Sequence, residues 1–337
     1  MGIEIAFLDV GNADSIVVHL NEQDALLIDL ARPRYVCEWL EKCGVLNLKS
    51  VYITHGHADH SPKLSNLHNF IKQWLNRGLE LVMLPGELLN TNRKINDPNE
   101  MERLHNLLGE LRDLENNSSV RFQLPRRDPR PYQYGDVAIT CLHPSELERV
   151  ERDQFDSEEK NEVSAVYRVD YGAFRAVLMA DVNNKGIDSF LRYFHNLRTQ
   201  EIHCNLIKVP HHGAWDTSLE SLFDHVDPEL AVLSVGSTNS YGHVRLELFA
   251  MLWRRQQDEQ TRLRRFLCTE ATRSCLLPVA EHREREGMKE KTPCGGDIVV
   301  IIPDASGVWQ LRDEQEQRAR ADCWPYAACL GRLTNHQ

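Results

Sequence analysis

The sequence predicts an α/β protein, because strand-like and helix-like segments alternate in both halves of its 337 residues. Short β-branched apolar runs indicate strands, and segments with an apolar face at helical spacing indicate helices. A composition of 42% hydrophobic and 26% charged residues is ordinary for a globular protein with a sizeable core. No apolar run approaches the roughly 20 residues that a membrane helix needs, so we expect no membrane contact.

In the first half, strands with alternating apolar residues come before the first helix. Gly11-Asn12 and residues 21–24 supply turns between the first three strands, and Gly44 is a suitable end for the first helix. The predicted elements are strands at 3–9, 14–20 and 25–30, a helix at 34–43, a strand at 50–53, a helix at 63–76, a strand at 79–84 and a helix at about 100–115.

The second half continues the same alternation. Its predicted elements are strands at 133–142, 163–170, 174–180 and 204–209, a helix at 217–225, a strand at 230–235, a helix at 244–256, and strands at 263–268 and 297–303. The segment after residue 312 is mostly polar. We therefore predict one domain over residues 1–312 and a C-terminal tail over 313–337.

Charge and cysteine content restrict the partners and the compartment. The formal net charge is −11, whereas a protein that binds nucleic acid tightly by itself is usually basic. The nine cysteines are odd in number and form no Cys-x-x-Cys pair, which indicates reduced thiols. The N-terminus reads as a strand and not as a secretory signal. We expect a cytoplasmic protein.

Residues 54–60 hold the densest group of metal-binding side chains, directly after the apolar strand predicted at 50–53. In an extended segment alternate side chains point the same way, so His55, His57 and Asp59 can converge on one point. His60 precedes Ser61-Pro62, where a helix start can turn it toward a second point. Imidazole and carboxylate suit zinc, with manganese or iron as alternatives. A merely solvated polar loop would rarely have this pattern.

Three other apolar strands end in residues of the same kind. Residues 25–28 and 176–180 run into Asp29 and Asp181, and residues 205–210 are followed by His211 and His212. An aspartate at a strand end can be an ordinary turn residue, but an adjacent His-His-Gly after a buried strand has little structural explanation.

The loop at 55–60 resembles the His-x-His-x-Asp-His signature of the metallo-β-lactamase superfamily. Residues 7–15, 208–213 and 234–243 are similar to the metallo-β-lactamase domain of ComEC competence proteins, of which this chain would be a free-standing relative. The resemblance implies a four-layer αββα sandwich of two mixed sheets with outer helices. It also implies two divalent ions, Zn²⁺ or alternatively Mn²⁺, held by His55, His57, Asp59, His60, Asp181 and His211.

The resemblance assigns roles to further residues. Asp181 matches the carboxylate that bridges the two ions, and Asp29 matches an aspartate that orients the histidine loop. His212 is the alternative to His211. No histidine matches the third ligand of the first ion, for which His143 and Asn161 are two candidates.

Two residues are predicted to act on the substrate. Asp59 would orient the attacking water as well as bind metal. His243, in a Tyr-Gly-His turn, would contact a phosphate or protonate a leaving oxygen, although a capping or packing role is the alternative.

The function indicated first is a metal-dependent phosphodiesterase, a nuclease acting on DNA with partner proteins in defence, repair or uptake. An alternative is a small-molecule hydrolase acting on an ester, lactone, lactam or cyclic nucleotide. A third hypothesis is a binding subunit with a partial metal site. The same ligands would serve the first two functions, so the sequence motifs do not separate them.

Overall fold

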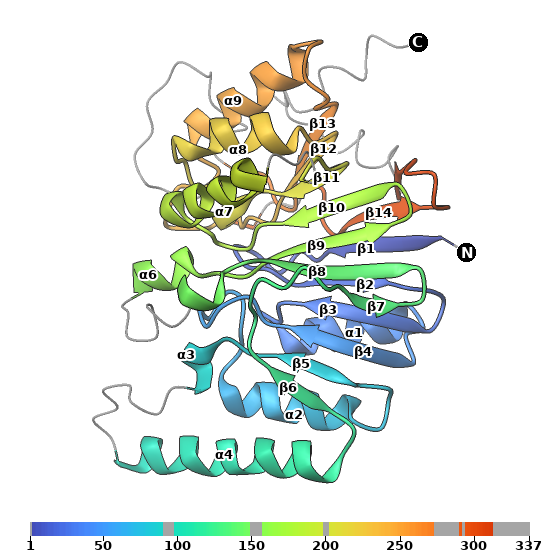
Figure 1. Ribbon diagram of the computed structural model, residues 1–337, viewed down its shortest axis with the longest axis vertical. Helices are drawn as coiled ribbons and strands as arrows, with labels where there is room; N and C mark the ends of the chain where they lie inside the picture. The colour runs from blue at the N-terminus through green and yellow to red at the C-terminus, as the bar shows by residue number, and fades with distance from the viewer. Residues whose placement is uncertain are drawn as a thin grey trace.

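Two mixed β-sheets pack face to face in the computed structural model (Figure 1). The structure describes residues 2–89, 98–148, 157–197, 202–272, 290–291 and 294–312. The tail predicted at 313–337 lies outside these ranges.

The first sheet is built mainly from the N-terminal half of the chain. Its strand order is β15-β14-β1-β2-β3-β4-β5-β6. The strands β3 to β6 run parallel to one another, and the other neighbours are antiparallel. The strands are β1 (Ile3–Phe7), β2 (Ile16–His19), β3 (Asp24–Ile28), β4 (Asn47–Tyr52), β5 (Leu81–Met83), β6 (Arg121–Gln123), β14 (Ile298–Ile302) and β15 (Gln310–Leu311).

The second sheet comes from the C-terminal half, in the order β13-β12-β11-β10-β9-β8-β7. Here β10 to β13 are parallel, and β7 to β10 form antiparallel pairs. The strands are β7 (Tyr132–Tyr134), β8 (Val137–His143), β9 (Val166–Tyr171), β10 (Phe174–Leu178), β11 (Leu206–Lys208), β12 (Leu230–Leu233) and β13 (Arg265–Cys268).

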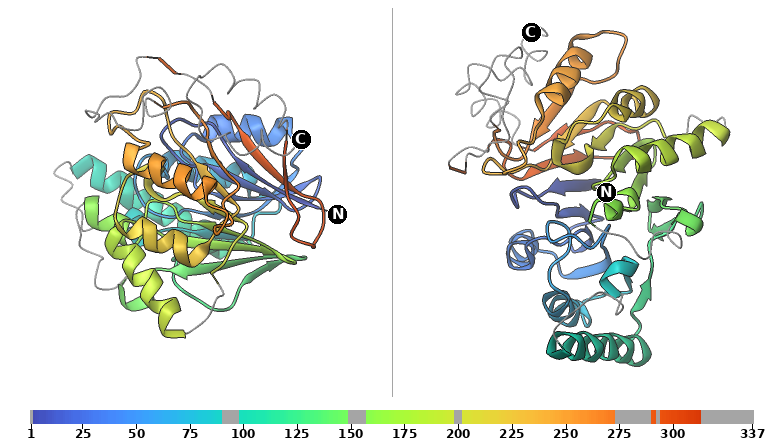
Figure 2. Two further views of the ribbon diagram at one scale, coloured as in Figure 1. Left: turned by 90° about the horizontal axis from the view of Figure 1, so that it is seen from above. Right: turned by 90° about the vertical axis from the view of Figure 1, so that its left-hand side faces the viewer.

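Helices cover the outer face of each sheet, on opposite sides of the pair (Figure 2). The first sheet carries α1 (Pro33–Lys42), α2 (Leu64–Trp74) and α4 (Pro98–Asn117). The second carries α7 (Asn184–Leu197), α8 (Ser218–Val226) and α9 (Leu246–Gln257). The short α3 (Gly86–Leu89), α6 (Ser157–Glu162) and the 3₁₀ turn η1 (Pro210–Gly213) lie in connecting segments.

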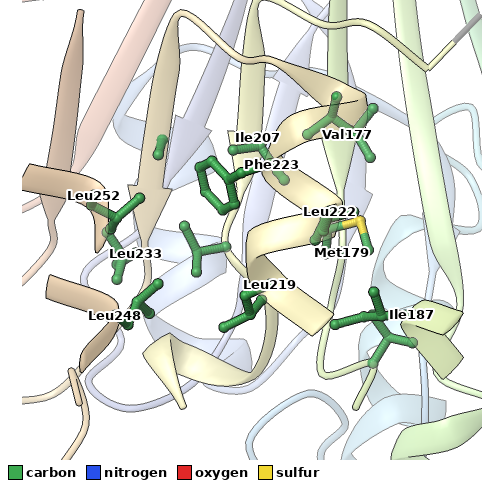
Figure 3. Close-up of a cluster of buried hydrophobic side chains, with 14 of the residues drawn as sticks. Val177, Met179, Ile187, Ile207, Leu219, Leu222, Phe223, Leu233, Leu248 and Leu252 are labelled. Carbon is green, nitrogen blue, oxygen red and sulfur yellow. The ribbon is translucent and has the colours of Figure 1, made fainter. Parts of the chain in front are cut away.

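Three apolar layers hold these four layers together. One lies between the sheets and includes Phe7, Tyr52 and Tyr167, all fully buried. The other two lie between each sheet and its helices. In the second half, Phe223 and Leu252 point from α8 and α9 onto the strand residues Ile207 and Leu233 (Figure 3). The four-layer αββα arrangement expected from the sequence is therefore confirmed.

Some elements differ from the prediction. The strand expected at 133–142 is a hairpin, because Gly135, with φ +58°, turns the chain between β7 and β8. Helix α7 and strand β6 were not predicted. None of the helices in the described ranges combines the length and the apolar composition needed to span a bilayer.

Candidate metal centre

The loop after β4 brings two imidazoles to one point. His55 Nε2 and His57 Nδ1 lie 3.1 Å apart. Two nitrogens bound to one tetrahedral zinc ion, each at about 2.0–2.1 Å, would be separated by about 3.3 Å. The other nitrogen of His55 lies 3.1 Å from Ser164 Oγ and 3.2 Å from Thr54 Oγ1, which fixes the orientation of the ring. His55 Nε2 and His57 Nδ1 thus have nearly the separation that a shared ion requires.

A second group of potential ligands surrounds Asp181. Its Oδ1 lies 3.0 Å from His60 Nε2 and 3.4 Å from His212 Nε2. His212 Nε2 also lies 3.6 Å from Asp59 Oδ2. These nitrogens and Asp181 Oδ1 are buried and, among the described residues, are not aligned for any hydrogen bond. Orphaned polar atoms of this kind are rare unless a further group satisfies them. The donor set fits a divalent ion that prefers nitrogen and oxygen ligands.

Asp29 contacts this cluster on the side away from Asp181. Its carboxylate accepts hydrogen bonds from His60 Nδ1 at 2.6 Å, from Thr54 N at 2.8 Å and from Thr54 Oγ1 at 2.8 Å. Because His60 donates its Nδ1 proton to Asp29, His60 Nε2 is the nitrogen left for an ion. Asp29 is itself in the left-handed region, with φ +59°, which turns the chain at the end of β3.

We predict that Asp29→Ala lowers metal affinity by about 10- to 100-fold, the usual cost of removing a partner that orients a ligand. The measurement is competition with a coloured chelator. Asp24→Ala, at the other end of β3, is the matched control, because Asp24 bonds only to groups remote from the cluster, Asn21 and Asn47 among them. Equal metal affinity in the Asp29 variant and the wild type would contradict the role.

A buried lysine balances the negative charge of the cluster. Lys208 is 0% exposed, on β11, and its ammonium donates to Ala180 O at 2.8 Å. It also contacts Asp14 Oδ2 and lies 3.7 Å from Asp181 Oδ1. Neither Asp14 nor Lys208 was predicted as a site residue. A lysine within the apolar run Leu206–Val209 was the signal available in the sequence.

The charges of the metal-free cluster follow from these contacts. Burial opposes ionisation of every member, but the carboxylates of Asp181 and Asp29 outweigh it and hold the pKa of His60 well above its ordinary value. The pKa of His212 is raised against burial by Asp181 and Asp59. The pKa of His55 is instead well below its ordinary value, because burial acts together with the charge of His60.

These pKa shifts predict how metal binding depends on pH. His60 and His212 hold protons above the ordinary histidine pKa of about 6.5, and an ion must displace them. Metal affinity should therefore rise by up to tenfold per pH unit and per displaced proton, from about pH 6.5 until the raised pKa values are passed. Chelator competition at several pH values, with proton release recorded on metal addition, tests this. An affinity independent of pH above 6.5 would contradict it.

Other predicted residues lie around the cluster with different contacts. His211 Nε2 lies 3.4 Å from Asn161 Nδ2, and its ring faces His243 at a centroid distance of 5.7 Å. Asn161 Oδ1 is buried and, among the described residues, has no hydrogen-bond partner. His143 is buried, and its Nε2 lies 2.7 Å from the carbonyl oxygen of Glu162.

The cluster opens onto a cleft with a volume of about 1000 Å³. Asp59, with its side chain 33% exposed, lies where the cluster meets the cleft. Burial, together with His211 and His212, lowers the pKa of His243 to about 3, so its ring is neutral near pH 7. The cleft is lined by Asn12, His57, Ala58, Asp59, Asn161, Asp181, His211, His212, Ala214, Trp215, Thr238, Asn239, Ser240, Tyr241, His243 and Arg245.

Comparison with known proteins gives distant similarities. No family model matches the chain. ComE operon protein 3 of Bacillus subtilis (strain 168) is 26% identical over 99 residues, which cover 29% of this chain and 12% of that protein. The matched region is thus a small part of that longer relative, and the match fits the ComEC-like resemblance.

Solved structures are similar at low sequence identity. The metallo-β-lactamase fold protein YhfI from Bacillus subtilis aligns with a TM-score of 0.40 and 11% identity, covering 69% of this chain and 86% of YhfI. The short form of human tRNase Z aligns with a TM-score of 0.36 and 12% identity, covering 68% and 92%. The chain thus has two mixed sheets between outer helices and a His-x-His-x-Asp-His loop after β4 that faces Asp181, and it is similar to metallo-β-lactamase-fold proteins.

Proposed function

We propose that the protein is a metal-dependent hydrolase of phosphodiesters, a nuclease acting on DNA. The observation that carries the metal chemistry is the pair of adjoining ligand groups, one at His55 and His57 and one at His60 and His212, with Asp181 against the second. The resemblance to ComEC-like domains supports the choice of phosphodiesters. The two-ion arrangement is one that phosphatases and nucleases use.

The ligand assignment follows the positions of the imidazole, carboxylate and carboxamide groups in the cluster. We propose His55, His57 and Asn161 for one ion, Asp59, His60 and His212 for the other, and Asp181 between them. His212 replaces His211 in this proposal because its Nε2 faces Asp59 and Asp181, whereas His211 faces Asn161. His143 is left out because its Nε2 is engaged by Glu162.

Each of three residues near the ions would have its own role in catalysis. When bound, zinc or manganese ions polarise a phosphoryl oxygen and lower the pKa of water. Asp59 would orient the attacking water at the mouth of the cluster. His243 is neutral, so it would contact the substrate through an N–H group and not as a protonated acid. Asp29 would hold the proton on His60 Nδ1 throughout.

The cleft favours an extended substrate over a small enclosed one. It is lined by loops from both halves of the chain, and Tyr241 on its rim is 61% exposed. A hydrolase for a small ester or lactone would more often bury most of its ligand in an enclosed pocket.

We also propose that a partner protein presents the DNA strand to the cleft. The chain carries a net charge of −11, and three arginines in α9 and the segment after it are paired with carboxylates in the structure. Such pairs leave few cations to neutralise phosphates, so binding to free DNA should be weak and should fall steeply with salt. The pairs are Arg254–Glu220, Arg255–Asp224 and Arg262–Glu229.

Metal analysis of the purified protein, with cleavage assays on single- and double-stranded DNA and on RNA in zinc and in manganese, tests the proposal. We expect bound divalent metal and metal-dependent cleavage of DNA. Hydrolysis of a small ester, a lactone or a cyclic nucleotide without cleavage of any nucleic acid would favour a small-molecule hydrolase that uses the same metal ligands. Absence of bound metal and of all activity would favour the binding subunit.

A further inference from the structure

An exposed aromatic ring stands at the rim of the cleft. The large hydrophobic side chains that are exposed in the described part of the chain are Leu46, Leu147, Tyr241, Trp253 and Val308. Of these five, Tyr241 lines the cleft beside the metal centre. A ring left 61% exposed at such a place is available to a ligand.

The ring of Tyr241 is stacked on that of His243. Their centroids are 5.6 Å apart and their planes differ by 15°. His243 in turn faces His211 at 5.7 Å, next to the metal cluster. One side of the Tyr241 ring is therefore supported from within the protein. A flat group that stacked on the other side would lie beside the reacting centre.

Hydrogen bonds with Asn239 fix the backbone that carries the imidazole of His243. The side chain of Asn239 is buried, and its Oδ1 accepts from His243 N at 2.8 Å. Its Nδ2 donates to His243 O at 2.7 Å. The backbone on both sides of the imidazole is thus fixed by one side chain. A site ordered in advance loses little conformational entropy when it binds.

We propose that Tyr241, supported by His243, stacks against a nucleobase next to the scissile phosphate, so that the substrate is a single strand or an unpaired end. The proposal rests on the proposed phosphodiesterase function and names its substrate class. Bases inside a duplex are stacked on their own neighbours, whereas an unpaired base has a free face.

Two neighbouring residues suit the same occupant. Trp215 lines the cleft and packs partly against the core of the second half, and Arg245 adds a guanidinium to the lining. An aromatic face accepts any base, and a cation contacts any phosphate. We therefore expect cleavage with little dependence on sequence.

The first test compares Tyr241→Ala, Tyr241→Phe and Trp253→Ala. Trp253 is an exposed aromatic on α9 that does not line the cleft, and so provides the matched control. With metal-loaded protein and a single-stranded oligonucleotide, Tyr241→Ala should lower kcat/KM by about 5- to 150-fold, the range for loss of one stacked base. Tyr241→Phe keeps the ring and should behave like the wild type. Equal activity of Tyr241→Ala and Trp253→Ala would show that Tyr241 does not stack against a base of the substrate.

An abasic substrate separates stacking from a structural effect. Removal of the base next to the cleaved phosphate should cost the wild type as much as the Tyr241→Ala change does. The same removal should cost Tyr241→Ala nothing further. Additive losses, or a wild type that prefers duplex to single strand, would refute the proposal.

Binding distinguishes failure of this proposal from failure of the proposed function. In an Asp181→Ala background, which blocks cleavage, anisotropy of a labelled single strand should show the same 5- to 150-fold loss with Tyr241→Ala. If the wild type cleaves no phosphodiester but this loss of binding appears, the proposed function is wrong and the stacking of a base on Tyr241 is supported. If cleavage occurs but neither binding nor kcat/KM depends on Tyr241, the stacking proposal is wrong and the proposed nuclease function is supported.

Discussion

Asp181→Ala is expected to abolish metal-dependent cleavage. Its carboxylate lies 3.0 Å from His60 Nε2 and 3.4 Å from His212 Nε2, and all three side chains are buried. If Asp181 holds the ions as proposed, its loss would remove several kcal/mol of transition-state stabilisation, and each 1.36 kcal/mol is a factor of ten in rate. We expect a fall of about 10³-fold or more.

The variant should remain folded, because Lys208 keeps its contacts with Asp14 and Ala180 when Asp181 is removed. Metal content should fall together with the rate, which inductively coupled plasma mass spectrometry measures. Asp188→Ala, an exposed carboxylate on α7, is the control and should change neither quantity. An Asp181→Ala protein with full metal content and an unchanged rate would show that the carboxylate is not a ligand.

Those parts of the centre that depend on local chain geometry were predictable from the sequence. An apolar strand followed by a metal-binding side chain marks Asp29, His55 and Asp181, because strand ends on one side of a sheet meet at one edge. The structure brings Asp29 and Asp181 onto opposite nitrogens of His60, at 2.6 and 3.0 Å. The pairing of the two sheets, by contrast, required the family resemblance, since strand patterns alone do not say which sheets face each other.

The sequence did not show which of the two adjacent histidines, His211 or His212, faces Asp181. His211 and His212 both have φ +50°, in the left-handed region, within the turn that follows β11. In an ordinary extended strand end the first residue past the strand would have been the natural choice. The left-handed turn instead aims His212 at Asp181 and leaves His211 beside Asn161. Backbone conformation at single residues of this kind has no clear signature in side-chain pattern.

The contacts of Lys208 were not predictable from the sequence for a different reason. Its position in an apolar strand was visible, but its partners come from distant segments: Asp14 follows β1, and Ala180 follows β10. A buried lysine is costly unless it is paired, and here the negative charges of Asp14 and Asp181 hold its pKa above the ordinary value in spite of burial. The structure thus places a permanent cation next to a cluster that would itself receive cations.

Lys208→Met should therefore destabilise the metal-free protein by about 3–5 kcal/mol, the cost of leaving one partner of a buried pair without its counter-charge. The carboxylate of Asp14 is 0% exposed and would lose its ammonium partner, with only His60 Nδ1, at 3.6 Å, left as a nearby positive group among the described residues. Urea unfolding measures the change in the free energy of unfolding. The matched control is Lys185→Met: Lys185 pairs with Glu162 at 2.6 Å but is 66% exposed, so its loss should cost less than about 1 kcal/mol.

Combining Lys208→Met with Asp14→Asn distinguishes charge from packing. If the uncompensated carboxylate causes the loss, removal of its charge should restore part of the stability, so the double variant should be more stable than Lys208→Met alone. A double variant that is less stable, by the sum of two independent losses, would show that Lys208 acts through its packed side chain. Metal should also reverse part of the defect in Lys208→Met, since an ion bound near Asp181 supplies positive charge to the region that has lost the ammonium. A Lys208→Met protein that unfolds at the same urea concentration with and without zinc would contradict this electrostatic account.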